Sequence, residues 1–178
     1  MDSPTCGWGE VRELPRPETY LLGRWEERNW RNVPGPFYGA ATDTCWSGRA
    51  IAPAHVLYDD EGGQEFIYRQ PLTEPEAHQV LLAAWSDPMS GYARDGDEHW
   101  TAASVREWWR ERRRLLEWID QATAKWSVST RADEREAVTG LRDYAAYMAG
   151  ALPLDLRRYL FGLDQGRVPG DGDMLPEL

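Results

Sequence analysis

The sequence has few cysteines and histidines and no long apolar run. Its 178 residues include only 2 cysteines and 3 histidines. Two thiolates are too few for an iron–sulfur cluster held by four cysteines or for a zinc site held by cysteine alone. No segment approaches the roughly 20 consecutive apolar residues that a membrane helix needs. We therefore predict no bound metal or cofactor and no membrane span.

Positive charge is also scarce. The chain has 20 Lys and Arg against 30 Asp and Glu, a net charge of −10. Residues 1–98 hold 17 acids and 8 bases (net −9), whereas residues 99–178 hold 13 and 12 (net −1). Such a field repels nucleic-acid phosphates and anionic lipid surfaces, so we expect neither as a partner. A basic patch on another protein is the natural complement, and a surface that serves only solubility is the alternative.

The N-terminus lacks the pattern of a secretory leader. Residues 1–5 contain no basic segment followed by an apolar stretch, so we expect a cytoplasmic protein. In that reducing compartment Cys6 and Cys45 are expected to be thiols.

The N-terminal half is rich in proline and glycine and has little regular pattern. One exception is the pair of segments 55–58 and 65–68, in which Val56, Tyr58 and Phe66 favour β-structure around an acidic turn that contains glycine. Glycine permits the positive φ that such a turn requires. We predict a β-hairpin here.

After residue 72 apolar residues recur at helical spacing. The segments 73–87, 133–148 and 153–163 each carry a capping residue or a proline near one end, and are predicted to be helices. The longest predicted helix runs from Thr101 to Trp126. Its apolar stripe consists of Val105, Trp108, Trp109, Leu115, Leu116, Ile119 and Trp126, and Trp118 falls off it.

These elements predict a single α+β domain over residues 1–165. Three or four helices form its core in the C-terminal half, and the loop-rich N-terminal half contains a small antiparallel sheet or hairpin. Residues 166–178, which are rich in proline and glycine, are predicted to be a loose tail.

Tryptophan is abundant where phenylalanine is rare, with 10 indoles against 3 phenyl rings. Several rings lie in the segment 30–46. Because Trp, Tyr and Arg supply most of the binding energy at protein interfaces, we interpret Trp30, Tyr38 and Trp46 as aromatic anchors for a partner. The alternative is that these rings only cover the helices.

Carboxylates and an imidazole gather just before the longest predicted helix. Asp95, Asp97 and His99 offer the oxygen and nitrogen ligands that divalent cations take. The spacing does not match an EF-hand loop, because the turn glycine and the closing Glu are in the wrong places. We favour a solvated loop whose acids complement the positive end of the helix. A role as base or metal ligand is the alternative.

Arg112 puts a charge in the middle of the apolar stripe, where an unpaired charge is costly. The functional interpretation is a pocket in which Arg112, beside indole rings, holds a carboxylate, a phosphate or the acidic side chain of a partner. The alternatives are a buried ion pair with an acid of the N-terminal half, or a side chain that extends to the rim of the core.

Three strings carry a resemblance to known proteins. They are residues 30–46, residues 65–71 (EFIYRQP) and residues 95–100 (DGDEHW). With them the chain resembles, over nearly its whole length, a set of uncharacterised Trp-rich proteins from high-GC actinobacteria. Some of those proteins are labelled ferredoxin, which two cysteines contradict because a conventional cluster takes four thiolates. The resemblance implies a source and no activity.

We expect a cytoplasmic binding protein of the inhibitor or immunity type, more readily than an enzyme. Its acidic, aromatic N-terminal face would steer and then anchor a partner that has a basic patch. The alternative is a small-molecule-binding protein or an enzyme, in which Arg112 holds an anionic group and Asp95, Asp97 or His99 acts as base or metal ligand. A pocket around Arg112 would favour the alternative, and an exposed flat aromatic patch would favour the partner.

Overall fold

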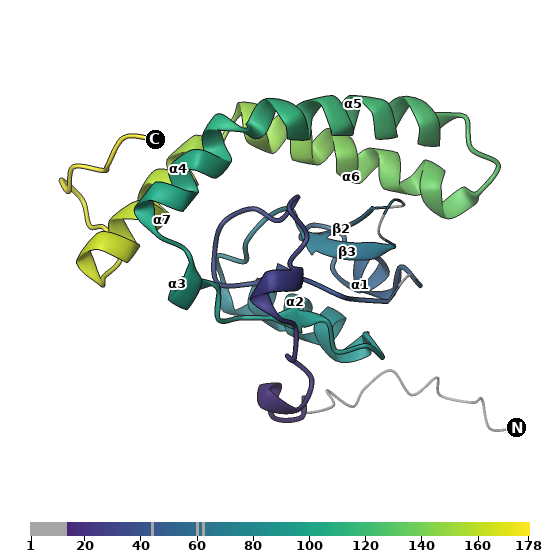
Figure 1. Cartoon of the computed structure of the whole chain (residues 1–178), viewed down its shortest axis with the longest axis horizontal. Coiled ribbons are helices and arrows are strands. Elements are labelled where there is room, and N and C mark those ends of the chain that lie inside the picture. The colour runs from purple at the N-terminus through teal and green to yellow at the C-terminus, as the bar shows by residue number, and fades with distance from the viewer. Residues whose placement is uncertain (1–13, 44, 60, 62) are drawn as a thin grey trace, which may run out of the picture.

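The computed structural model describes residues 14–43, 45–59, 61 and 63–178. Residues 1–5, on which the expectation of no secretory leader depends, lie outside these ranges, as does Cys6. Within them the chain has an α+β fold, with seven helices mostly in the C-terminal half and two small antiparallel sheets (Figure 1). The predicted fold class is confirmed. None of the helices in this part of the chain is both long and apolar enough to cross a membrane.

The elements of the N-terminal half are short. They are the 3-10 turns η1 (Pro17–Thr19) and η2 (Trp25–Glu27), strand β1 (Tyr38–Gly39), helix α1 (Ser47–Ile51), strands β2 (Val56–Asp59) and β3 (Gln64–Ile67), and helix α2 (Glu74–Ser86). After strand β4 (Tyr92–Ala93) the chain is helical: α3 (Gly96–His99), α4 (Ala102–Arg110), α5 (Arg112–Ser127), α6 (Ala132–Ala149) and α7 (Leu152–Gln165).

Strands β2 and β3 form the predicted hairpin, which lies in the middle of the fold. Leu57 pairs with Phe66, and Val56 with Ile67, in antiparallel register. Because side chains alternate across a strand, the first pair packs into the core shared with the C-terminal helices and the second into a core around α2. The hairpin is therefore covered on both faces, which explains the consecutive apolar residues in each strand.

A second sheet, between β1 and β4, was not predicted. Tyr38 pairs with Ala93, and Gly39 with Tyr92. Each strand is only two residues long, too short for a periodic pattern to be recognised. Glycine is required at position 39, because a Cβ atom there would collide with the backbone oxygen of Glu65.

Helix α2 begins at the predicted cap. The Thr73 hydroxyl accepts a hydrogen bond from the Glu76 backbone N–H at 3.4 Å, and the Glu76 carboxylate accepts one from the Thr73 backbone N–H at 3.0 Å. This reciprocal capping box satisfies two N–H groups that a helix start leaves without partners.

The long helix predicted from Thr101 is in fact two helices. The backbone departs from helical geometry at Glu111 (φ −81°, ψ 0°), between α4 and α5. Helix α5 buries Leu115, Trp118, Ile119, Ala122 and Trp126. Leu116, which was predicted on the stripe, is 36% exposed, and Trp118, which was predicted off it, is 8% exposed. The prediction used a single helical wheel from Thr101 to Trp126, which assumes that the rotation per residue stays constant. The break at Glu111 interrupts that rotation, so the wheel gives the wrong buried face for these two residues of α5.

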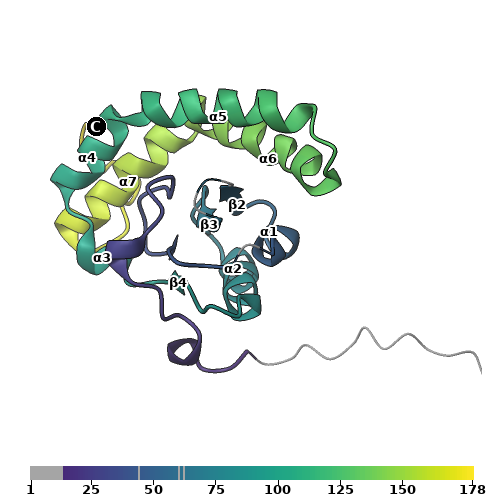
Figure 2. The same cartoon turned by 45° about the vertical axis from the view of Figure 1, so that its right-hand side comes forward.

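Helices α4 to α7 form an arch over the N-terminal half (Figures 1 and 2). Helix α5 packs along α6, and α4 packs along α7. The predicted helices at 133–148 and 153–163 are confirmed as α6 and α7, with Gly150 as the C-cap of α6. The concave side of the arch buries Tyr144 and Leu141 in the same core as the hairpin.

The segment predicted to be a loose tail, residues 166–178, forms no helix or strand. Arg157 of α7 donates hydrogen bonds to the carbonyls of Leu175 and Pro176, at 2.9 and 2.8 Å. Arg106 of α4 donates to the carbonyl of Glu177 at 2.8 Å. The end of this segment therefore lies against the α4–α7 pair.

Candidate functional site

A cleft of about 540 Å³ lies at the bend between α4 and α5. Residues 28–30 and 32 of the N-terminal half line it on one side, and the two helices line it on the other. We call it the Arg–Trp cleft, after its three arginines and three indoles: Arg28, Arg112, Arg114, Trp30, Trp100 and Trp108. Its volume is in the range of small-molecule sites.

Arg112 lies at the border of this cleft and is half-buried. Its guanidinium donates a hydrogen bond to the Trp109 carbonyl at 2.8 Å and lies 4.2 Å from the centroid of the Trp109 ring. Among the described residues no carboxylate is within ion-pair distance of it. None of the acids that the structure describes therefore forms the suggested buried ion pair with Arg112, and its guanidinium extends to the rim of the cleft, where a ligand can contact it.

Arg28 and Arg114 are also held by indoles rather than by carboxylates. The Arg28 guanidinium lies 3.9 Å from the Trp25 ring centroid, and that of Arg114 lies 4.0 Å from the Trp30 ring centroid. Burial lowers the pKa of Arg28 from its ordinary value, but the group stays charged at neutral pH. A cation–π contact does not neutralise a charge. Three positive charges thus border one cleft, and none has a counter-ion in the described part of the chain.

Two carboxylates border the cleft as well. Glu107 is bonded to Arg110, which lies outside the cleft, and this pair balances its charge. Glu111 lies exposed at the bend. Three arginines against one unbalanced carboxylate make the cleft locally positive in a protein whose net charge is −10.

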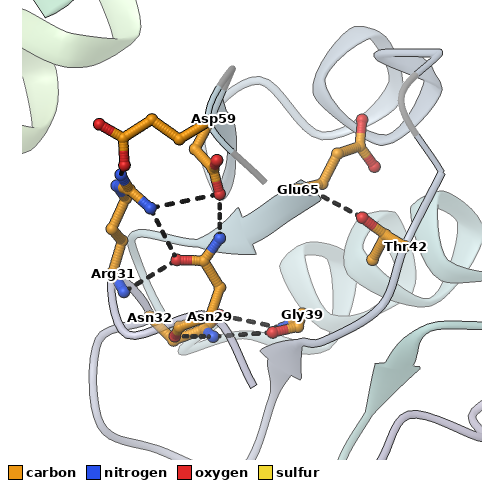
Figure 3. Close-up of polar contacts among 8 residues, drawn as sticks. Asn29, Arg31, Asn32, Gly39, Thr42, Asp59 and Glu65 are labelled. Carbon is orange, nitrogen blue, oxygen red and sulfur yellow. Dashed lines mark hydrogen bonds and ion pairs between the residues drawn. The ribbon is translucent and has the colours of Figure 1, made fainter. Parts of the chain in front are cut away.

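Arg31 supports the N-terminal wall of the cleft, and Figure 3 shows its polar contacts with Asn29 and Asp59. It is 3% exposed, and its guanidinium lies 4.5 and 4.4 Å from the ring centroids of Trp30 and Trp118. It forms ion pairs with Asp59 at 3.3 Å and with Glu61 at 2.7 Å. This buried cation links the wall to the hairpin on one side and to α5 on the other.

Two asparagines complete the support of this wall (Figure 3). The Asn29 amide donates to Asp59. The Asn32 amide oxygen accepts from the backbone N–H groups of Gly39 (2.9 Å) and Ile67 (2.8 Å), and its nitrogen donates to the Gly39 carbonyl at 2.8 Å. Residues 28–32 form no helix or strand, and these side-chain hydrogen bonds take the place of the backbone pairing that regular structure would provide. The wall is therefore preformed.

Comparison with known protein families, curated proteins and solved structures found no match. What the cleft can bind therefore follows from its own side chains. Guanidinium groups bind carboxylates and phosphates through two parallel hydrogen bonds. The Trp108 ring, half-buried in the cleft wall, stacks on no other ring in the described ranges and offers an aromatic face or edge.

Two of the three predicted aromatic anchors are buried. Tyr38 is 1% exposed and Trp46 is 7% exposed. The Tyr38 hydroxyl donates to Asp95 at 2.8 Å, and the Trp46 ring packs on Tyr58 with centroids 4.2 Å apart. Only Trp30 is partly exposed, and it lines the Arg–Trp cleft. Trp30, Tyr38 and Trp46 therefore do not form a flat exposed patch, because Tyr38 and Trp46 pack into the interior between the hairpin, the helices and the short sheet.

Asp95 and His99 contact each other. The Asp95 carboxylate accepts from the Tyr38 hydroxyl and faces the His99 Nε2 atom at 3.2 Å. Burial raises the pKa of Asp95, but the hydrogen bonds from Tyr38 and His99 outweigh this effect and hold the pKa below the ordinary value of an aspartate. The His99 ring stacks on Trp25 with centroids 4.8 Å apart. The pair serves to brace α3 against the N-terminal half.

Asp97 points to a different part of the molecule, where its carboxylate accepts a hydrogen bond from the Tyr159 hydroxyl at 2.7 Å. None of Asp95, Asp97 and His99 lines the Arg–Trp cleft, so the structure does not bring them together with Arg112. Across the described residues, no group of three or more His, Cys, Asp and Glu side chains is arranged to hold a metal ion.

Glu65, a residue of β3, carries a separate buried carboxylate that faces α1 and β4. The residue is 0% exposed. It accepts hydrogen bonds from the Tyr92 hydroxyl at 2.6 Å and from the Arg49 backbone N–H at 3.2 Å. Burial raises the pKa of Glu65 to about 7 against these hydrogen bonds, and the charges of Asp43 and Asp87 add to the rise. No cation pairs with it within the described ranges, and it does not line the Arg–Trp cleft.

Sequence reasoning missed Arg28 and Arg114 and assigned Trp108 to the core. The available signal was the interleaving of arginine and tryptophan over residues 24–31 (RWEERNWR), a composition typical of sites that combine charge with stacking. It gave no information on which helix the segment would face.

Proposed function

We propose that the Arg–Trp cleft binds a small organic anion with a planar ring, and that the protein is a ligand-binding protein. The observation that carries the proposal is the convergence of Arg28, Arg112 and Arg114 without a carboxylate partner in the described part of the chain. By contrast Arg113, the chain neighbour of Arg112, is paired with Glu117 at 2.9 Å. An anion supplies the missing counter-charge.

The rest of the ligand is inferred from the walls. Trp108 offers an indole for stacking, and an aromatic pair adds about 0.5–1.5 kcal/mol beyond the burial of area. A volume of about 540 Å³ accommodates a single ring system with one charged group. A long nucleic acid is disfavoured, because it would meet the field of a chain with a net charge of −10.

The hypothesis of an inhibitor-type or immunity-type factor has less support at the aromatic N-terminal face. Of its anchors, only Trp30 is accessible, and it belongs to the cleft. We also propose a cytoplasmic location, which the free and exposed thiol of Cys45 supports.

Calorimetric titration tests the proposal directly. The probes are a panel of aromatic carboxylates and nucleoside monophosphates, with inorganic phosphate as the control without a ring. We expect ring-bearing anions to bind more tightly than phosphate. Arg112→Gln should weaken binding by about tenfold to a hundredfold, because a hydrogen bond to a charged group contributes about 1.5–3 kcal/mol.

Arg113→Gln is the matched control. Its side chain is 89% exposed and lies outside the cleft, so the variant loses the same charge without losing a site residue and should bind as the parent does. Trp108→Ala should weaken the ring-bearing anions and leave phosphate unchanged. Equal weakening by Arg112→Gln and Arg113→Gln, or no binding by any member of the panel, would show that the cleft is not an anion site.

A further inference from the structure

A second cleft, of about 970 Å³, lies between the loops at residues 33–36 and 70–72 on one side and α7 with residues 166–169 on the other. We call it the proline cleft, because prolines of both loops line it. We propose that this cleft binds an extended segment of another protein in which a lysine or arginine adjoins aliphatic or proline side chains. The proposal does not depend on the function of the Arg–Trp cleft.

The loop wall is rigid before any partner arrives. The Gln70 amide nitrogen donates to the carbonyls of Val33 (2.9 Å) and Phe37 (2.7 Å), and its oxygen accepts from the Phe37 backbone N–H (3.1 Å). The Pro36 carbonyl accepts from the Gly96 backbone N–H at 3.0 Å. A wall that is already ordered does not have to lose conformational freedom on binding.

The surface of the proline cleft is mainly apolar. Leu156, Tyr159 and Leu163 follow one another at helical spacing along α7 and line one side. At the rims, Leu72 is 72% exposed and Val168 is 85% exposed. Large apolar side chains exposed on the rims of an apolar cleft are typical of a surface that a partner covers.

The charge of the cleft selects a basic partner. Asp97 accepts a hydrogen bond only from the neutral Tyr159 hydroxyl, so its charge is not balanced by an ion pair in the described chain. Asp155 lies 3.6 Å from Arg158, and Arg167 is bonded to Asp173 outside the cleft. The remaining charge is therefore negative, as is that of the whole chain.

The same observations decide between a partner segment and other occupants. A second copy of this chain would bring another charge of −10 to a cleft whose unbalanced charge is that of Asp97, which like-charge repulsion disfavours. A volume of about 970 Å³ is at the upper end of small-molecule sites. An extended segment with alternating side chains suits such an open cleft better, because its apolar side chains contact the walls while a basic side chain reaches Asp97.

Selection from a library of displayed random short peptides tests the proposal. The selected peptides should be enriched in Lys or Arg beside Leu, Val or Pro. Their consensus, made as a fluorescent peptide, should bind about fivefold more weakly to Asp97→Asn, in which the amide oxygen can still accept from Tyr159. It should bind about tenfold more weakly to Leu72→Ser, which removes an exposed apolar contact.

Glu98→Gln is the matched control, because Glu98 is an exposed neighbour on the same short helix and does not line the cleft. The consensus peptide should bind it with unchanged affinity. The proposal is overturned if the selected peptides are acidic or show no enrichment, or if Asp97→Asn and Glu98→Gln weaken binding equally. Sedimentation that shows self-association of the chain, abolished by Leu72→Ser, would equally overturn it in favour of a second copy.

Discussion

Replacing Glu65 by glutamine should make the protein more stable at alkaline pH and change little at acidic pH. Glu65 is enclosed, with no cation beside it in the described ranges, and its charged form is therefore disfavoured in the folded state. Glutamine has nearly the same shape and accepts a hydrogen bond through its amide oxygen, but it never ionises.

The magnitude follows from the pKa of Glu65, which is about 7 in the folded protein against an ordinary value of 4.5. Because the folded-state pKa is the higher one, the folded state binds the proton more tightly. The stabilisation that this tighter proton binding by Glu65 provides is complete below about pH 4.5. It decreases as the pH rises to about 7 and is absent above that. At about 1.4 kcal/mol per pH unit, the parent loses about 3 kcal/mol over this window.

Guanidinium denaturation of the parent and Glu65→Gln, at intervals from pH 5 to pH 8, measures this loss. All other titrating groups are common to the parent and the variant. The pH dependence of the difference between their unfolding free energies therefore reports on Glu65 alone. We expect this difference to increase by about 2–3 kcal/mol in favour of the variant between the two ends. Glu98→Gln, which changes an exposed carboxyl group, should show no such trend.

A difference between parent and Glu65→Gln that stays constant from pH 5 to pH 8 would refute the reasoning. It would mean that Glu65 has the same pKa in the folded and unfolded chains, and therefore that water or a rearranged cation reaches it. A variant that is less stable than the parent at pH 8 would refute it as well, because the hydrogen bonds from Tyr92 and Arg49 would then outweigh the cost of burial.

Three further substitutions test other parts of the fold by their denaturation midpoints. Gly48→Ala should destabilise by about 1–3 kcal/mol, because its Cβ atom would collide with the Glu65 carboxylate. Arg31→Met should cost about 3–5 kcal/mol, since it removes the cation of a buried ion pair. Thr73→Ala should cost about 1 kcal/mol through loss of the capping box of α2, whereas Thr73→Ser, which keeps a hydroxyl, should stay close to the parent.

For each of these three predictions, one result would contradict the reasoning behind it. An unchanged midpoint in Gly48→Ala would show that α1 can move away from the hairpin. A small effect of Arg31→Met would show that packing between Trp30 and Trp118, rather than charge, holds the wall of the Arg–Trp cleft. Equal losses in Thr73→Ala and Thr73→Ser would place the effect elsewhere than in the cap.

The parts of the fold that depend on neighbours in the chain could be predicted from the sequence. The hairpin at 55–68 is set by β-favouring residues on both sides of a turn, and α2 by the reciprocal bonds of Thr73 and Glu76. The break at Glu111 could not be predicted, because the surrounding residues contain no proline or glycine. It arises where α4 pairs with α7 and α5 with α6, a requirement of packing between distant segments.

The candidate site was predicted only in part, for the same reason. Arg112 was identified because its charge conflicts with an apolar stripe, a signal contained in one helix. Arg28 reaches the same cleft from a segment more than eighty positions earlier, and no local pattern encodes that approach. Tyr38 was misjudged as an exposed anchor because its burial depends on the pairing of β1 with β4.

The arch has two bends: one at Glu111, between α4 and α5, and one at Gly150, between α6 and α7. Both lie where the α4–α7 pair meets the α5–α6 pair (Figures 1 and 2). Trp108 belongs to the pair α4–α7, whereas Arg112 and Arg114 belong to the pair α5–α6. The width of the Arg–Trp cleft is therefore tied to the angle between the two pairs. A ligand bound across the bend, as proposed, would contact both pairs and so oppose changes in the angle between them.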